Sequence, residues 1–294
     1  MAKKSKKKSD KGSQPSATPF TDALKVSEGF VLADLDTRAT PAFDGKKKDG
    51  QAALADYDDE LSTLQEKMYA ASVGGDSRRR VLLVVQGMDT SGKGGIMRHV
   101  VGLVDPQGVE ITAFKQPTAE ELSHPFLWRI RKRLPEPGII GVFDRSHYED
   151  VLIVRVHDLV PPQQWARRYS TINDFEQGLV DDEVTVIKVM LHISSGEQKD
   201  RLARRLDRDD KHWKFNPGDI DERKHWPAYQ EAYQEALERC STDAAPWFVV
   251  PADRRWYARL AVQQLLLEHL RALDLGWPKA DFDVEHEKER LART

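Results

Sequence analysis

Between positions 80 and 250, the apolar residues of this chain gather in short runs that are separated by longer, more polar stretches. Runs rich in Val, Ile and Leu, mostly without strict alternation, are typical of strands that are buried on both faces of a sheet. Five such runs predict five strands, at residues 81–85, 109–114, 139–143, 185–193 and 247–250.

Apolar residues at helical spacing fill the stretches between these runs. Beyond the fifth run, Asp253 is positioned to N-cap a final helix that continues to Leu273 and stops before Gly276 and Pro278. Strands that alternate with helices predict βαβ units and a parallel sheet covered by helices on both faces. The earlier helices are predicted over residues 93–104, 119–134, 161–177, 197–206 and 220–239.

The first 76 residues follow a different pattern. Their first twenty are rich in Lys, Ser, Gly and Pro, which predicts a disordered tail, and the next thirty are interpreted as an extended arm. Apolar residues then recur every three or four positions from Leu54 to Ala71, which predicts an amphipathic helix that either packs on the body or contacts another subunit. We therefore divide the chain into a tail (1–20), an arm with a helix (21–76), an α/β domain (77–280) and a C-terminal tail (281–294).

Charge is unevenly distributed along the chain. Its 294 residues carry 45 Lys and Arg against 48 Asp and Glu, a formal net charge of −3. Residues 1–11 hold six lysines and one acid, so this segment is +5 and the rest of the chain is −8. A lysine run of this kind is either a solubilising tail or a binding segment for nucleic acid or another polyanion. Because no aromatic residue lies among the lysines, we favour the tail and expect no requirement for nucleic acid.

Composition also limits the compartment. The chain has a single cysteine, Cys240, which excludes an internal disulfide framework and a cysteine-cluster metal site. We expect Cys240 to serve as a small core residue. No apolar run approaches the roughly 20 residues that cross a bilayer, and no apolar signal-peptide core follows the N-terminal lysines. These features predict a cytoplasmic protein without membrane contact.

A glycine-rich loop follows the first predicted strand. From Gly87 to Lys93 the sequence reads G-x-x-x-x-G-K, directly after a buried strand and at the start of a helix. Its glycines allow backbone N–H groups to turn inward around phosphate oxygens, and the helix N-terminus adds positive dipole. Lys93 contributes a point charge. The loop residues predicted to surround the phosphates are Gly87, Thr90, Ser91, Gly92 and Gly94.

This loop departs from the usual phosphate loop in two ways. Gly94 occupies the position where a Ser or Thr hydroxyl normally holds Mg²⁺, and a carboxylate, Asp89, lies inside the loop. A carboxylate that faces phosphates is repelled unless a cation lies between them, and a bridging Mg²⁺ fills that role. We therefore expect Asp89 to replace the missing hydroxyl as a metal ligand. The alternative is an Asp that caps the loop backbone.

A second acid ends the third predicted strand. Asp144 follows the apolar run in the arrangement of a Walker-B carboxylate, which lies beside the phosphate loop and meets the metal. The next residue, Arg145, either clamps a phosphate or pairs with Asp144. His147 is interpreted as a structural histidine with satisfied hydrogen bonds rather than as a base, because a phosphate acceptor is already ionised.

Basic residues cluster in two further places. Seven lie between positions 199 and 214, and Arg201, Arg205 and Arg208 share one helical face. Such a segment between the fourth and fifth strands is either a solvated, salt-bridged helix or a mobile lid, at about residues 200–220, that neutralises a transferring group and excludes water. Lys115 and the basic residues at 129–133 form the other cluster. Together these cations predict a channel for a long polyanion.

Four sequence blocks together resemble the polyphosphate kinase 2 family. They are G-M-D-T-S-G-K-G-G, F-K-Q-P-T-A-E-E-L-S-H-P-F-L-W-R, F-D-R-S-H-Y-E-D-V-L and R-x-x-x-R-L-D with K-x-W-K-F, and the resemblance covers roughly residues 30–280. It implies an α/β P-loop kinase fold with a five-stranded parallel sheet and a helical lid. The implied activity is reversible, Mg²⁺-dependent transfer of the terminal phosphoryl group of inorganic polyphosphate to a nucleotide. The acceptor is a diphosphate such as ADP or GDP, a monophosphate such as AMP, or both.

The resemblance also assigns residues. Asp89 with Lys93 matches the family's Walker-A pair, and Asp144 with Arg145 its Walker-B pair, so that Asp89 and Asp144 hold the Mg²⁺. The H-Y-E-D stretch that contains Glu149 resembles family members that accept nucleoside monophosphates as well as, or instead of, diphosphates. The expected catalytic residues are Asp89, Lys93, Asp144, Arg145 and Arg205. Further contacts with the phosphates or the nucleotide are expected from Lys115, Arg129, Arg201, Arg208, Lys211 and Lys214.

Two rival functions remain at this point. An ATP-dependent kinase on the same fold is disfavoured by the abundance of basic residues and by Gly94. A non-enzymatic polyanion binder that uses the lysine tail is the second rival. We expect a homo-oligomer, a dimer or a tetramer.

Overall fold

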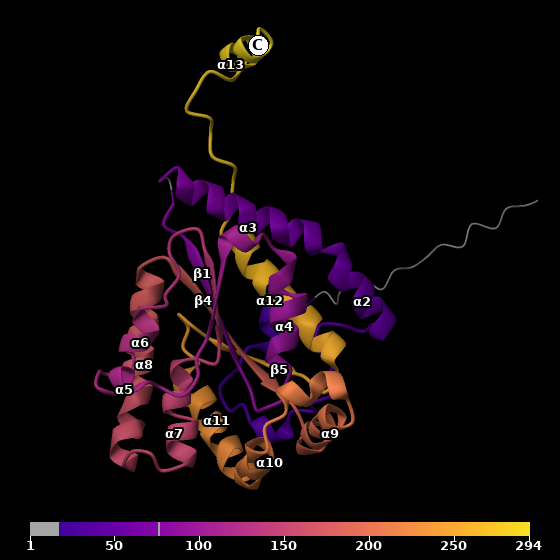
Figure 1. Cartoon of the computed structure of the whole chain (residues 1–294), viewed down its shortest axis with the longest axis vertical. Coiled ribbons are helices and arrows are strands. Elements are labelled where there is room, and N and C mark those ends of the chain that lie inside the picture. Colours follow the sequence, from indigo (N-terminus) through magenta and orange to yellow (C-terminus); the bar gives the residue numbers. More distant parts are fainter. Residues whose placement is uncertain (1–17, 76) are drawn as a thin grey trace, which may run out of the picture.

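The computed structural model describes residues 18–75 and 77–294 and has a parallel sheet at its centre (Figure 1). Its strand order is β2-β3-β1-β4-β5, and every pairing within it is parallel. All five predicted strands are confirmed, each within one or two residues. Their bounds are β1 (Arg80–Gln86), β2 (Val109–Ala113), β3 (Ile140–Asp144), β4 (Val184–His192) and β5 (Trp247–Pro251).

Helices cover both faces of the sheet, as the strand patterns predict. Every residue of β1 is buried, whereas the edge strand β2 is mostly open to solvent. One face packs against the N-terminal segment and the last long helix, through α1 (Phe20–Leu24), α3 (Asp58–Val73), α4 (Lys93–His99) and α12 (Arg255–Ala272). The other face packs against α6 (Trp128–Arg131), α8 (Pro162–Asp181) and α11 (Trp226–Cys240).

Prolines divide two helices that the pattern predicts as continuous. The predicted helix at 119–134 is instead two single turns, α5 (Ala119–Leu122) and α6, with Pro125 between them. The predicted helix at 220–239 is divided at Pro227, which lies in the first turn of α11 and follows α10 (Gly218–Glu222). Proline lacks the N–H that continues a helix and clashes with the preceding turn, so it is found at a helix start.

Two helix termini also differ from the prediction. The first helix after the loop, α4, ends at His99, and a 3₁₀ turn (Val101–Leu103) completes the segment. The predicted N-cap role of Asp253 is wrong, because Arg254 occupies the N-cap of α12 without a side-chain cap. The Asp253 carboxylate instead accepts hydrogen bonds from Ser194 and from the Thr37 hydroxyl, at 2.8–2.9 Å.

The N-terminal segment is more helical than predicted. The arm at 21–50 includes α1 and the start of α2 (Lys47–Asp56), and the amphipathic pattern is divided at Tyr57 into α2 and α3. Leu61 and Met68 are fully buried in the core, so this helix packs on the body. Of the predicted tail, residues 1–17 lie outside the described residues, whereas Phe20 is buried and belongs to the fold.

The C-terminal segment leaves the body. Residues 274–283 form an extended stretch that carries α13 (Val284–Leu291) away from the other elements in Figure 1. No helix within the described ranges is long and apolar enough to span a bilayer. The remaining short elements are α7 (Ile153–Val156) and α9 (Ser195–Leu206), with 3₁₀ turns at Leu32–Asp34, Pro106–Gly108, His147–Asp150 (η4), Asp209–Lys214 (η5) and Arg223–His225.

Candidate active site

The glycine-rich loop turns tightly between the end of β1 and the start of α4. Gly87 has φ 147°, and a Cβ atom there would lie 2.6 Å from the Leu191 carbonyl oxygen, so only glycine fits. Gly92, at the N-cap of α4, has φ 122°. Thr90 also has a positive φ, of 64°, which is uncommon for a residue with a side chain. The chain is thus bent so that the loop backbone surrounds the start of the helix.

Lys93 lies inside this loop. Its ammonium group donates to the Gly87 carbonyl oxygen at 2.7 Å. Burial and the neighbouring Arg145 lower the pKa of Lys93, while the carboxylates of Asp89 and Asp144 act to raise it. The lysine is therefore a cation held within reach of both predicted metal-binding acids.

The strand register brings the second acid to the loop. Asp144 ends β3 and is the register partner of Val85 on the adjacent β1. The next residue, Arg145, has φ 66° and donates its backbone N–H to the Val85 carbonyl at 3.1 Å. A residue held in this region stores strain that the surrounding structure must support.

Arg145 pairs with Asp89 rather than with Asp144. Its guanidinium donates to the Asp89 carboxylate at 2.9 Å, and it lies 3.6 Å from Glu149. Although burial acts to lower it, these carboxylates raise the pKa of Arg145. The predicted alternative of a local Asp144–Arg145 pair is replaced by a bridge across the site. Arg145 therefore lies where it can exchange a carboxylate for a phosphate.

The donor set suits a hard divalent cation that substrate also helps to hold. Asp89 and Asp144 both line the loop cavity, and carboxylate oxygens are ligands that Mg²⁺ prefers. Within the described ranges, no group of three or more His, Cys, Asp or Glu side chains could hold a metal by itself. Mg²⁺ usually keeps waters and binds through one or two carboxylates plus phosphates, so two acids fit it. The buried Thr90 hydroxyl, which has no hydrogen-bond partner in the described chain, also fits a site completed by a ligand.

A cavity of about 530 Å³ opens in front of the loop. We call it the loop cavity. It contains most of the predicted site residues, and its lining carries eleven cationic side chains and two carboxylates. The predicted members are Asp89, Thr90, Ser91, Gly92, Lys93, Gly94, Asp144, Arg145, Arg201, Arg205, Arg208, Lys211 and Lys214.

Three cations of this cavity were missed by sequence reasoning, and a fourth, Arg204, was counted in the basic cluster at 199–214 without a role of its own. Arg98 comes from α4, Arg204 from α9, and Arg255 and Arg259 from the first turns of α12. No acid in the described chain pairs with Arg98, Arg255 or Arg259, and burial together with neighbouring arginines lowers the pKa values of Arg255 and Arg259. A sequence signal for Arg255 and Arg259 was available. The two arginines are four residues apart at the start of a helix that follows a strand, so they share one helix face.

Arg201 lies elsewhere than the lid prediction implies. It is only 2% exposed, and its guanidinium donates to the backbone carbonyls of Thr90 and Ser91 in the loop. The same guanidinium donates to the Ala252 carbonyl after β5 and to the Glu197 carboxylate. Arg201 thus braces the loop against the neighbouring strand end, instead of presenting a free cation to substrate.

The other predicted lid cations form local pairs at the cavity rim. Arg205 donates to the Lys214 carbonyl and to Asp219 at 3.1–3.2 Å. Arg208 and Lys211 share the exposed carboxylate of Asp210. Exposed pairs of this kind contribute little stability and are readily exchanged for another anion. Arg205 belongs to α9 and Lys211 to η5, while Arg208 lies in the link between these elements, and all three are within the predicted lid.

Lys115 and Arg129 do not line the loop cavity. Arg129 donates to the Lys115 carbonyl at 2.8 Å and lies 3.3 Å from Glu121. It lines a second cavity, of about 650 Å³, bounded by α5, α6 and α8. This second cavity also includes Phe126, Asp150, Arg167 and Arg168, and the rest of its lining mixes prolines and aliphatic residues with uncharged polar and charged ones. Lys115 and Arg129 therefore lie away from the loop cavity, although they too are near the carboxyl ends of the strands.

Glu149 lines neither cavity, but it contacts Arg145 next to the loop. With the Gln86 side-chain amide turned so that its nitrogen faces the carboxylate, Gln86 donates to Glu149 at 3.1 Å. Burial raises the pKa of Glu149, although Arg145 and Lys93 act to lower it. Its neighbour Asp150 faces the second cavity and accepts from Arg168 at 2.8 Å. The consecutive acids of η4 thus have different partners, Arg145 and Gln86 for Glu149 and Arg168 for Asp150.

The comparisons with known proteins agree with this geometry. The family model described as polyphosphate kinase 2 (PPK2) matches residues 44–275. The chain belongs to the polyphosphate kinase 2 family. An AMP/ADP-polyphosphate phosphotransferase of Meiothermus ruber is 43% identical over 86% of this chain and 92% of the relative. An ADP-polyphosphate phosphotransferase of Rhodopseudomonas palustris is 39% identical over 88% of this chain and 92% of the relative.

A solved structure extends the match to three dimensions. The crystal structure of polyphosphate kinase 2 from Arthrobacter aurescens TC1 aligns with a TM-score of 0.94 at 53% identity, covering 96% of this chain and 100% of that one. Membership in the polyphosphate kinase 2 family and the α/β P-loop kinase fold predicted from the sequence are therefore both confirmed. The four sequence blocks that carry the resemblance lie along the two cavities and the rim between them.

Proposed function

We propose that this protein transfers the terminal phosphoryl group of inorganic polyphosphate to a nucleoside diphosphate or monophosphate, reversibly and with Mg²⁺. Membership in the polyphosphate kinase 2 family carries the proposal, and the two curated relatives named above act by their names on AMP or ADP and polyphosphate. The cationic loop cavity supports it independently, because its charge suits a long polyanion better than a single nucleotide.

Polyphosphate occupies the loop cavity. The loop's backbone N–H groups and Lys93 bind the reacting end, as in other phosphate loops. The unpaired Arg98, Arg255 and Arg259 of the described chain continue the positive surface beyond the loop and bind the following phosphates. Binding should weaken steeply with salt, by analogy with counterion release from nucleic acids.

The nucleotide occupies the second cavity. Its apolar and aromatic lining, which includes Phe126, suits a base and ribose, while the exposed Arg167 suits the charged end of a nucleotide. Asp150 lines this cavity and follows Glu149, which contacts Arg145 at the loop. A nucleotide bound there can therefore extend its phosphate toward Arg145. In this arrangement the acceptor lies beside α5 and α6.

The chain's own residues then carry the transfer by position and charge. The acceptor phosphate oxygen is already ionised, so it attacks the terminal phosphorus without a general base. The bond from that phosphorus to its bridging oxygen breaks, and polyphosphate leaves one unit shorter. Lys93, Arg145 and the rim residue Arg205 stabilise the spread negative charge of the loose transition state. A Mg²⁺ held by Asp89 and Asp144 would neutralise phosphate charge and align the reacting oxygens.

Closure of the α9–η5 segment would complete the site. Its cations are paired with weakly held surface acids such as Asp210, which phosphates can replace. Closure brings positive charge to the transferring group and excludes water, which would otherwise hydrolyse it. The cytoplasmic location and the homo-oligomer remain predictions from the sequence.

The decisive assay is direct. Purified protein is incubated with polyphosphate and Mg²⁺, separately with AMP, ADP and GDP, and the nucleotides are resolved by chromatography. We expect ADP to become ATP, with AMP also phosphorylated if Glu149 has the role that the resemblance implies. No phosphorylation of any acceptor, and no reverse reaction from ATP, would contradict the proposal.

Two arms of the assay address the rival functions. An ATP-dependent kinase would phosphorylate its acceptor with ATP alone, in the absence of polyphosphate. A polyanion binder that relies on the lysine tail would lose its binding when residues 1–17 are deleted, whereas the kinase should keep its turnover, because the buried Phe20 stays in place.

A further inference from the structure

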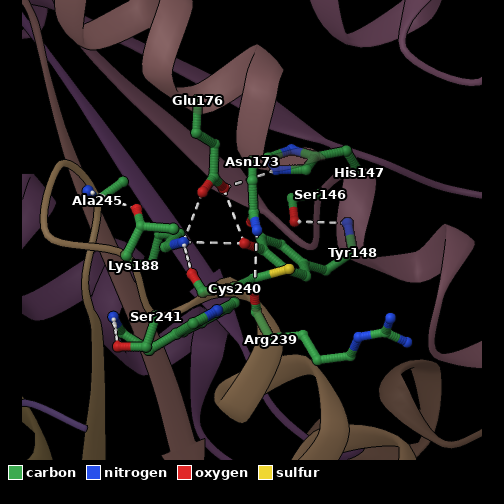
Figure 2. Close-up of polar contacts among 12 residues, drawn as sticks. Ser146, His147, Tyr148, Asn173, Glu176, Lys188, Arg239, Cys240, Ser241 and Ala245 are labelled. Atoms are coloured by element: carbon green, nitrogen blue, oxygen red, sulfur yellow. Dashed lines mark hydrogen bonds and ion pairs between the residues drawn. The ribbon is translucent and has the colours of Figure 1, made fainter. Parts of the chain in front are cut away.

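A buried charge cluster lies behind the sheet, on the face covered by α8 and α11 (Figure 2). Lys188 projects from the middle of β4 and is fully buried, with apolar residues of the same strand on either side of it. Glu176 of α8 and Tyr148 of η4 are also buried. None of these side chains lines either cavity. The proposed reaction therefore gives them no direct role.

Every donor of the lysine has a partner. Lys188 Nζ donates to Glu176 Oε2 at 2.5 Å, to the Tyr148 hydroxyl at 2.9 Å and to the Cys240 carbonyl at 2.6 Å. An ammonium group has three protons, so its hydrogen bonding is complete. The cluster joins β4, α8, η4 and the C-terminal end of α11.

The carboxylate of Glu176 holds η4 through two consecutive residues. Its Oε1 accepts from the Tyr148 hydroxyl at 2.9 Å and lies 3.0 Å from His147 Nε2. Although burial acts to raise the pKa of Glu176, the nearby Lys188 keeps it lowered, so the group stays ionised. The Tyr148 ring also packs edge-on against Trp247 of β5, with centroids 4.6 Å apart. The inward side of η4 is therefore fixed at several points.

The other two residues of η4, Glu149 and Asp150, point away from the cluster and contact arginines of the site. Glu149 faces Arg145 and Gln86 at the loop, and Asp150 faces Arg168 at the second cavity. Arg145, with its φ of 66°, lies just before the turn. Because η4 is only four residues long, a shift of its inward pair moves the outward pair and Arg145 as well.

Stability alone is a weak reason for such a cluster. Replacing a buried ion pair by apolar residues of similar volume is often neutral or stabilising, because removing both charges from water is costly. A buried charged network does, however, fix one arrangement of the elements that it joins. An arginine that must meet a transferring phosphoryl group needs that kind of precision.

We propose that Glu176, supported by Lys188, is a positioning residue that holds η4 through His147 and Tyr148 and thereby sets Arg145 and Glu149 for phosphoryl transfer. The proposal rests on the proposed function. Such a residue acts in the transition state more than in substrate binding, so its loss should lower kcat while leaving KM nearly unchanged.

The test compares three variants in the polyphosphate-dependent assay. Glu176→Gln removes the charge that orders η4, and Tyr148→Phe removes one link while keeping the Glu176–Lys188 pair. Tyr257→Phe is the matched control, since its buried hydroxyl donates to the Pro41 carbonyl on the opposite face of the sheet. Circular dichroism and thermal melting confirm that each variant is folded at the assay temperature.

We expect Glu176→Gln to lower kcat by about 10²-fold, with KM for polyphosphate and nucleotide changed by less than about threefold. Tyr148→Phe should lower kcat by about three- to tenfold and Tyr257→Phe should leave it unchanged. A folded Glu176→Gln or Tyr148→Phe enzyme with wild-type kcat would overturn the proposal, as would a loss that merely follows the folded fraction. If Glu176→Gln does not fold, Tyr148→Phe decides. A wild-type protein without transfer activity would instead reject the proposed function.

Discussion

The two cavities at the carboxyl edge of the sheet differ sharply in charge. The loop cavity is lined by eleven cationic side chains and two carboxylates, whereas the second cavity has three arginines and two carboxylates among prolines, aliphatic residues and uncharged polar ones. Both lie where ligands bind in open α/β sheets, outside the ends of the parallel strands. Their difference supports the proposal of two separate sites, one for a long polyanion and one for a small acceptor with an aromatic base.

The arginines of the two cavities are also of two kinds, those paired within the protein and those without an acidic partner in the described chain. Arg201 and Arg168 are mostly buried and hold backbone or carboxylate groups in place. By contrast, Arg255 and Arg259 have no acidic partner within the described ranges and face the loop cavity. Cations that lack a partner in the protein are available to the substrate. The predictions below use this contrast, beginning with the largest expected effect.

Removing the loop cation should have the largest effect. Lys93→Ala takes away the charge closest to the transferring group and should lower kcat by about 10³-fold or more, while the fold persists. The rate of ATP formation from ADP and polyphosphate measures this. A variant that retains a tenth of wild-type kcat would show that the reaction does not occur at the loop.

Neutralising the unusual loop acid should come next. Asp89→Asn keeps an oxygen that can accept from Arg145 but removes the charge needed to hold Mg²⁺, so kcat should fall by about 10²-fold and the Mg²⁺ concentration for half-maximal rate should rise. A Mg²⁺ titration of the initial rate checks both. Full activity at the wild-type Mg²⁺ requirement would remove Asp89 from the metal site.

The loop cavity could largely be predicted from the sequence, because its signals are local. The loop motif follows β1 directly, and Asp144 ends a strand, so the parallel register alone brings both acids together. The spacing of Arg255 and Arg259 indicates a shared helix face, but not that this face meets the loop cavity, because that depends on how α12 packs beside α4. The role of Arg201 was also hidden, because its spacing is the same whether the side chain faces solvent or the loop.

The second cavity could not be predicted from the sequence for a different reason. Its wall is made by α5 and α6, which the apolar pattern predicts as one continuous helix. Pro125 divides that helix into two single turns, and the cavity lies between these turns and α8. The charge pattern at 129–133 revealed basic residues but could not indicate which cavity they face.

Neutralising unpaired arginines in one cavity at a time tests whether the two substrates bind at separate sites. The double variant Arg255→Gln with Arg259→Gln should raise KM for polyphosphate by roughly tenfold and reduce its dependence on salt, while KM for ADP stays within about twofold. Arg167→Gln, at the rim of the second cavity, should show the reverse pattern. Steady-state kinetics at several salt concentrations measure both. Equal changes in both KM values for either variant would contradict separate sites.

Substituting Gly94 should give the smallest change in kcat, and substituting Gly87 in the same loop serves as its control. Gly94 faces the loop cavity, and a methyl group added to it would meet no other part of the described chain within 4 Å, so Gly94→Ala should change kcat by less than about threefold. Gly87→Ala, whose Cβ would meet the Leu191 carbonyl at 2.6 Å, should abolish transfer. The same initial-rate assay compares them. A strong loss in Gly94→Ala would show that bound phosphate lies against this glycine.

The most direct test of two separate cavities is an initial-rate matrix in which polyphosphate and ADP concentrations are varied together. If both substrates are bound at once and the phosphoryl group passes between them without a covalent enzyme intermediate, double-reciprocal plots should give lines that intersect. Parallel lines would contradict this account, because they would mean that one site serves both substrates in turn through a phosphorylated enzyme.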